Sequence, residues 1–88
     1  MARFAIEQYL DQKNQWRKIF GEQPLSLMSS ADAQKIADML DSDLSPENLH
    51  CDGEITAAQA RTKYNFLTRA ASELRALYPN VKFYEFAE

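Results

Sequence analysis

The chain has little of what marks a disulfide-stapled, low-complexity or membrane-spanning protein. It contains one cysteine and one histidine, so it can form neither an internal disulfide nor a tetrahedral Cys/His metal site. Two glycines and three prolines are too few for a low-complexity linker. No stretch approaches the ~20 apolar residues that span a bilayer, and residues 1–4 lack the apolar core of a secretion signal. We therefore expect a soluble, cytoplasmic protein that does not interact with membranes.

The sequence does contain enough apolar surface for a folded domain. Hydrophobic residues make up 45% of it, including one tryptophan, four tyrosines and five phenylalanines. Surface scaling for a chain of 10.1 kDa allows roughly two thirds of its surface to be buried on folding. We expect residues 1–88 to form a single domain.

Charge is distributed in blocks. The net charge is −3, but residues 1–20 carry +2, residues 32–54 carry −6 and residues 57–78 carry +3. An acidic total argues against general nucleic-acid binding, which needs clustered Lys and Arg. The alternating blocks indicate charge complementarity within the fold or across a dimer, or simply solvated faces.

The clearest predicted helix covers residues 57–78. Thr56 and Gln59 form a potential capping box at its start, and Pro79 ends it. Its apolar residues form two adjacent stripes, which is too wide for one helical neighbour. The helix should therefore touch two elements, or one element and a second subunit. The first stripe is Ala60, Tyr64, Leu67, Ala71, Leu74 and Tyr78, and the second is Phe66, Ala70 and Leu77. Of the first stripe, Tyr64, Leu67, Ala71 and Leu74 are expected in the core.

Two further helices are predicted, one in the first twenty residues and one over about 30–42. Gly21 is suited to ending the first. Ser29, with Asp32 three residues later, is a weaker potential cap for the second. The apolar face of the first helix is Ala5, Ile6, Tyr9, Leu10, Trp16 and Phe20, and that of the second is Ala33, Ile36, Ala37 and Leu40.

The remaining segments complete an all-α class, a small bundle of three principal helices. Ser45-Pro46-Glu47 predicts a one-turn helix over residues 46–50, because serine caps, proline suits the first helical position and an acid suits the positive helix end. The extended aromatic tail, residues 81–86, is expected to pack its rings on the bundle, with a short strand as the alternative.

The run Leu-Ser-Pro-Glu-Asn-Leu-His-Cys-Asp-Gly-Glu at residues 44–54, followed by a basic, alanine-rich helix, resembles a pattern of small helical proteins of bacteria and their phages. The resemblance covers residues 44–74. It implies a bacterial or phage origin and a cytoplasmic location, and it transfers no catalytic residue or activity.

The residues with chemical potential do not combine into a catalytic or metal site. Asp41, Asp43 and Ser45 alternate as in a calcium loop, but Pro46 stands where glycine is needed and Asp52 where a glutamate is needed. His50 and Cys51 are adjacent and have no second His or Cys to complete a metal site. The two glycines are isolated, so no phosphate-binding loop exists. We expect no enzymatic activity, no cofactor and no bound metal.

Three bases interrupt the apolar faces. Lys13 and Arg17 lie on the face of the first helix, and Lys63 lies between the stripes of the long one. Their stems can cover apolar surface while their charges reach water, their charges can pair with the acids of residues 41–54, or they can rim a groove for a partner. The sequence leaves these three alternatives open.

Two functions from different classes follow. The first is a non-enzymatic protein-interaction or regulatory module. Its partner is unknown, and one candidate partner is a second copy of the chain in a homodimer. Its candidate interface residues are Lys13, Trp16, Arg17, Lys63, Phe66, Leu77, Phe83, Tyr84 and Phe86.

The alternative is a nucleic-acid-associated regulator that uses the basic face of the long helix. A helix-turn-helix needs a connection of three or four residues, whereas about fourteen residues, acidic in total, separate the second and third predicted helices. The candidate nucleic-acid contacts are Arg61, Lys63, Arg69 and Arg75.

Overall fold

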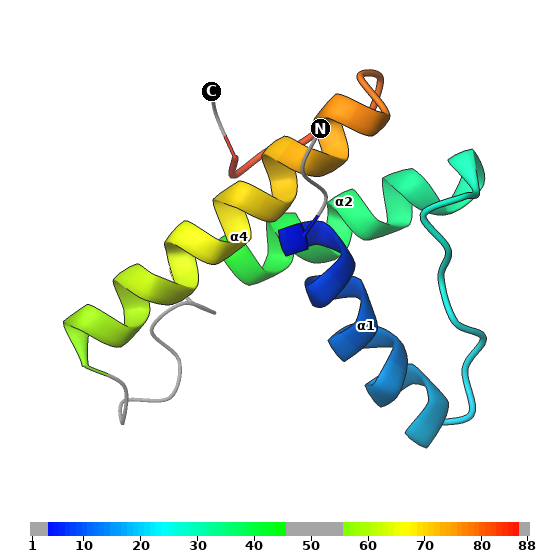
Figure 1. Cartoon of the computed structure of the whole chain (residues 1–88), viewed down its shortest axis with the longest axis horizontal. Coiled ribbons are helices and arrows are strands. Elements are labelled where there is room, and N and C mark those ends of the chain that lie inside the picture. Colours follow the sequence, from blue (N-terminus) through cyan, green and yellow to red (C-terminus); the bar gives the residue numbers. More distant parts are fainter. Residues whose placement is uncertain (1–3, 46–55, 87–88) are drawn as a thin grey trace.

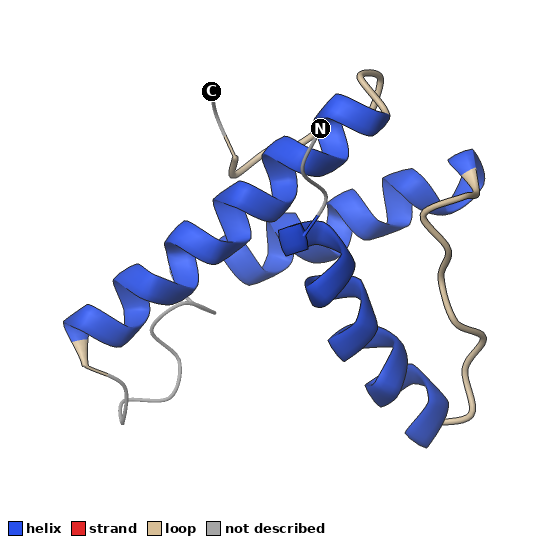
Figure 2. Ribbon diagram, viewed as in Figure 1, coloured by secondary structure: helices blue, strands red, loops and turns tan. Residues whose placement is uncertain are grey.

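The computed structural model describes residues 4–45 and 56–86, which contain three helices and no strand (Figures 1 and 2). Helix α1 spans Phe4–Ile19, α2 spans Ser30–Leu44 and α4 spans Ala57–Leu77. The all-α class with three principal helices is confirmed for this part of the chain. The predicted one-turn helix at 46–50 lies outside the described residues.

Local sequence explains where the helices begin and end. The capping box of α4 is present, since the Gln59 amide donates to Thr56 Oγ1 and the Thr56 amide donates to Gln59 Oε1. Gly21 follows α1 with φ +76°, the left-handed conformation that favours glycine. Ser29 occupies the N-cap of α2 but its side chain makes no capping hydrogen bond, and Asp32 instead accepts from the Ser26 amide.

Helix α4 is the centre of the bundle and contacts both α1 and α2, as its wide apolar arc predicts (Figure 1). The core is formed where the three helices meet. Its large, fully buried side chains are Ile6 of α1, Ile36 and Leu40 of α2, and Leu74 of α4. Glu73 reaches from α4 to the start of α1, where the Ile6 amide donates to its Oε1 at 2.9 Å.

One expectation about the core is wrong. Tyr64 is 47% exposed, whereas Leu67, Ala70, Ala71 and Leu74 are buried. Helical spacing places Tyr64 on the correct stripe, but the packed part of that stripe lies further along α4. A periodic pattern reports which face is apolar and carries no information about how far a neighbouring helix extends.

The apolar face of α1 is likewise covered along only part of its length. Ala5, Ile6, Tyr9 and Leu10 are buried, but Trp16 and Phe20 on the same face are 60% and 72% exposed. Helix α1 runs outward from α4, and its far end points away from the other two helices (Figure 1).

Helix side chains form hydrogen bonds with the backbone of two non-helical segments, the one that follows α1 and the one that follows α4. Asn14 accepts from the Leu25 amide and donates to the Leu25 carbonyl, both at 2.8 Å. Gln34 makes the same paired contact with the amide and carbonyl of Lys82, both at 3.0 Å. These side chains supply hydrogen-bond partners for backbone groups that have no partner in a helix or strand.

Candidate functional site

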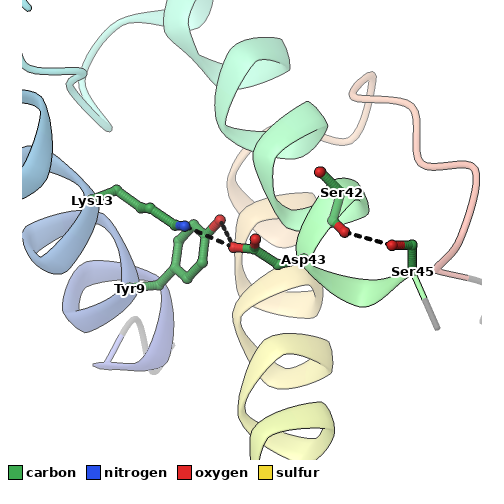
Figure 3. Close-up of polar contacts among 5 residues, drawn as sticks. All are labelled: Tyr9, Lys13, Ser42, Asp43 and Ser45. Atoms are coloured by element: carbon green, nitrogen blue, oxygen red, sulfur yellow. Dashed lines mark hydrogen bonds and ion pairs between the residues drawn. The ribbon is translucent and has the colours of Figure 1, made fainter. Parts of the chain in front are cut away.

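Asp43 of α2 joins two residues of α1 (Figure 3). The Tyr9 hydroxyl donates to Asp43 Oδ2 at 2.7 Å, and Lys13 Nζ lies 3.0 Å from the same oxygen. Lys13 also lies 5.5 Å from the centroid of the Tyr9 ring. The charge of Lys13 is therefore paired with an acid of the 41–54 block, one of the three alternatives that the sequence leaves open. The shared acid ties α1 to α2, which otherwise meet mainly through α4.

The environment of this cluster fixes the protonation state of Tyr9. Burial, the hydrogen bond to Asp43 and its negative charge all raise the pKa of the Tyr9 phenol well above its usual value. A phenol that stays protonated can donate to Asp43 throughout the physiological range.

The raised pKa of Tyr9 predicts a loss of stability in alkali. The unfolded chain ionises this tyrosine near pH 10 while the folded chain keeps the proton, so the contribution is complete below about pH 10 and declines above it. The decline should approach about 1.4 kcal/mol per pH unit. Urea unfolding between about pH 8 and pH 11 measures this decline in the free energy of unfolding. In Tyr9→Phe, which has no phenol to ionise, the decline above about pH 10 should be smaller than in wild type. Parallel pH profiles for the two proteins would contradict this assignment.

The end of α1 is held in one conformation. The Gly21 amide donates to the Lys18 carbonyl at 3.1 Å and the Glu22 amide to the Arg17 carbonyl at 2.7 Å, the two bonds of a Schellman motif. The Arg17 side chain donates to the Gln23 carbonyl at 2.7 Å and lies 3.3 Å from Glu22 Oε2. Arg17 therefore pairs with Glu22 of the following connector, and among the described residues of 41–54 neither Asp41 nor Asp43 forms an ion pair with it.

Three large apolar side chains stand exposed on this fixed end, which we call the α1-end patch: Trp16, Ile19 and Phe20. They are 60%, 71% and 72% exposed, and the Trp16 and Phe20 rings stack with centroids 6.2 Å apart. Their spacing of three and four residues places them on one side of the helix. Contiguous exposed apolar surface of this kind marks contact sites on folded proteins.

Lys63 and Phe66 lie in a second place, a groove between α1 and the first half of α4. The groove has a volume of about 540 Å³ and is also lined by Gln8, Gln12 and Gln59. Phe66 is half-buried at its wall, and Lys63 is exposed. The groove is lined on α1 by Gln8 and Gln12, and none of the three residues of the α1-end patch lines it.

The C-terminal candidates form a third group on α2 and the end of α4. Phe83 and Phe86 are half-buried and meet edge to face with centroids 5.4 Å apart, whereas Tyr84 is 85% exposed. Leu77 is half-buried near the start of α2. The predicted interface residues are therefore divided among three places rather than brought into one surface.

The four bases of the nucleic-acid hypothesis are divided as well. Arg61, Lys63 and Arg69 are exposed along α4. The Arg75 guanidinium instead lies 5.4 Å and 5.3 Å from the ring centroids of Phe83 and Phe86, so it packs on aromatic rings. Helices α2 and α4 are separated by residues 45–56, which is too long for a helix-turn-helix.

Asp41 and Asp43 accept hydrogen bonds from other parts of the fold. Asp41 binds the C-terminal segment and Asp43 binds Tyr9 and Lys13, so the two carboxylates do not converge. Residues 4–45 and 56–86 hold no cluster of three or more potential metal ligands. His50, Cys51 and Asp52 fall outside the described residues. None of the described helices has the length and apolar character needed to cross a bilayer.

Sequence reasoning missed Asp41, which is only 7% exposed. It accepts from three consecutive backbone amides, those of Tyr84 at 2.7 Å, Glu85 at 3.0 Å and Phe86 at 3.4 Å. A signal was present, since Asp41 continues the stripe of α2 that Ala37 and Leu44 occupy. An acid at an apolar position is buried only when donors surround it.

Comparison with known proteins gives no relative: no family model matches the chain, and no curated protein or solved structure matches it significantly.

Proposed function

We propose that the chain is a non-enzymatic protein-interaction module that associates with a second copy of itself through the α1-end patch. The observation that carries this proposal is the uncovered half of α1. The face that buries Ile6 and Tyr9 continues as Trp16 and Phe20, so the same stripe is core at one end of the helix and exposed at the other. A second copy supplies the missing neighbour.

The charges near the patch favour contact between like surfaces. Lys13 and Arg17 lie on the same face, and like charges brought together would repel. Both are already paired within the chain, Lys13 with Asp43 and Arg17 with Glu22. Two copies can therefore approach through apolar rings without bringing two unpaired cations of this face together.

The size of the patch predicts weak association. A buried aromatic side chain covers roughly 150–250 Å², so three side chains that are about two-thirds exposed offer roughly 300–450 Å² on each copy. The total of roughly 600–900 Å² is below the ~1,200 Å² of stable complexes. We expect a dissociation constant in the micromolar to millimolar range.

Sedimentation velocity over a rising concentration series tests the proposal. The wild-type chain should shift toward the dimer, and Phe20→Ser should remain monomeric with an unchanged fold. Tyr84→Ser is the matched control, because Tyr84 is an equally exposed ring away from the patch. A wild-type chain that is monomeric at about 1 mM, or a Phe20→Ser chain that dimerises equally, would reject the proposal.

A nucleic-acid role requires salt-dependent binding to generic duplex DNA. With Arg75 packed on two rings, three exposed bases remain on α4. We expect no such binding at about 0.15 M salt. DNA binding that weakens steeply with salt and is lost in Arg61→Ala would favour the nucleic-acid alternative instead.

A further inference from the structure

We propose that α2 and the last turns of α4 form a binding site for a short bent peptide, and that its occupant in trans is residues 81–86 of a second copy. In the structure the chain's own residues 81–86 fill this site. The inference is independent of the α1-end patch, which lies at the other end of α1 and shares no residue with it.

The site recognises backbone more than side chains. Gln34 makes paired hydrogen bonds with the amide and carbonyl of Lys82, and seven residues later on the same helix Asp41 receives the three amides of residues 84–86. Seven residues are close to two helical turns, so the two acceptors lie on one face of α2. The segment bends at residues 84 and 85, which turns three successive amides toward one carboxylate. An array of this kind can bind backbone of the same shape whether it comes from the same chain or from another.

Sequence selectivity comes from two rings. Phe83 and Phe86 are half-buried against the core and flank the Arg75 guanidinium of α4. Tyr84 and Glu85 between them are exposed, so their side chains add little to recognition. The preferred ligand is therefore a short segment with two aromatic residues three positions apart and a bend between them, and the same segment of a second copy fits by identity.

The connection to α4 is suited to exchange. Residues 78–80 have no helical conformation, and the Tyr78 hydroxyl is fixed separately by donating to the Leu27 carbonyl. Residues 81–86 include Val81, which is 9% exposed, belongs to the core and donates its amide to the Tyr78 carbonyl at 3.1 Å. Exchange therefore opens the core at Val81 until the segment of a second copy supplies the same side chain, hydrogen bonds and ring packing.

Binding of a synthetic peptide to full-length chains tests the site. The probe is a fluorescent peptide of residues 79–86, followed by anisotropy, and the control peptide carries Phe83→Ala and Phe86→Ala. In the wild-type chain, residues 81–86 of the same molecule compete with the probe for the site. The apparent affinity for the probe is therefore the intrinsic affinity multiplied by the fraction of chains whose site is open. A full-length Phe83→Ala/Phe86→Ala chain should bind the probe at least about ten-fold more tightly than wild type. Asp41→Asn added to that double variant should abolish binding.

Glu85→Pro provides a second test in case the Phe83→Ala/Phe86→Ala chain does not fold. Glu85→Pro removes one amide donor to Asp41 while its side chain points to solvent, so it weakens the internal segment without touching the rings. It too should bind the probe more tightly than wild type. Equal binding by all chains, binding of the control peptide, or no binding by any chain would overturn the proposal. If both tail variants unfold, residues 81–86 are a permanent core element and the proposal is equally rejected.

Exchange between full-length chains is the last arm, carried out with Phe20→Ser in every chain so that the α1-end patch is inactive. Asp41→Asn provides a chain with an intact segment and a weakened site, and Phe83→Ala/Phe86→Ala provides the reverse. Mixed together they should form a one-to-one complex by sedimentation, while each alone stays monomeric. A mixture that contains only monomers would contradict exchange, and this result does not depend on whether the α1-end patch associates.

Discussion

Leu67→Ala should lower the free energy of unfolding by about 2–5 kcal/mol, the usual range for truncating a buried leucine. Leu67 is 3% exposed in the middle of α4 and belongs to the cluster that unites the three helices. The substitution removes apolar packing and leaves a cavity beside the central helix. A domain of this size has about 5–10 kcal/mol of total stability, so much of it would disappear. Urea denaturation followed by circular dichroism measures the change.

Tyr64→Ala is the matched control. Tyr64 lies three residues earlier on the same stripe but is 47% exposed, so its truncation should cost less than about 1 kcal/mol. The two variants distinguish the structure, in which only Leu67 is buried, from the sequence pattern, which places both residues in the core. Equal losses for both variants would mean that the bundle covers the whole stripe.

Asp41→Asn should lower the free energy of unfolding by about 1.5–3 kcal/mol. The carboxylate accepts from the amides of Tyr84, Glu85 and Phe86 and is nearly buried, whereas a carboxamide accepts with one oxygen and turns an NH₂ group toward the remaining donors. The same denaturation series measures the loss. Hydrogen exchange at these three amides should accelerate more than exchange in α1.

Asp11→Asn makes the same chemical change at an exposed position of α1 and should alter stability by no more than about 0.5 kcal/mol. A similar loss in both variants would assign the effect to net charge. An Asp41→Asn chain as stable as wild type, with unchanged exchange at residues 84–86, would show that the carboxylate does not hold the C-terminal segment.

The helices could be predicted because their ends are decided locally. Thr56 with Gln59 specifies the start of α4, and Gly21 specifies the end of α1, both through contacts within a few residues. Helix α2 extends to Leu44, beyond the predicted end near residue 42, because Leu44 is buried and extends its core face. Tertiary packing therefore extends a helix that local signals leave undecided.

The extent of burial could not be predicted in the same way. Tyr64 lies on the stripe where the periodic pattern places it, yet it is 47% exposed, whereas Leu67 on the same stripe is buried. Trp16 and Phe20 lie on the apolar face of α1 and are exposed as well. How far two helices overlap depends on their crossing geometry, which the spacing of apolar residues does not determine.

The polar contacts were predictable only in part. The pairing of Lys13 with an acid of 41–54 is one of the alternatives that the charge blocks indicate, and Asp43 supplies that acid. The contacts of Gln34 and Asn14 with distant backbone groups have no sequence signature, because an exposed-looking amide on a helix can face either water or a loop. They depend on where the two non-helical segments run.

Trp16 fluorescence tests the central claim most directly, because the chain has one tryptophan and it lies in the α1-end patch. The emission maximum should shift to shorter wavelength as concentration rises from about 1 µM to about 1 mM, the range that brackets weak association. Phe20→Ser should remove the shift, and Tyr84→Ser should leave it unchanged. Trp16 emission that stays at the wavelength of a water-exposed indole across the whole range, in wild type and variants alike, would contradict association through this patch.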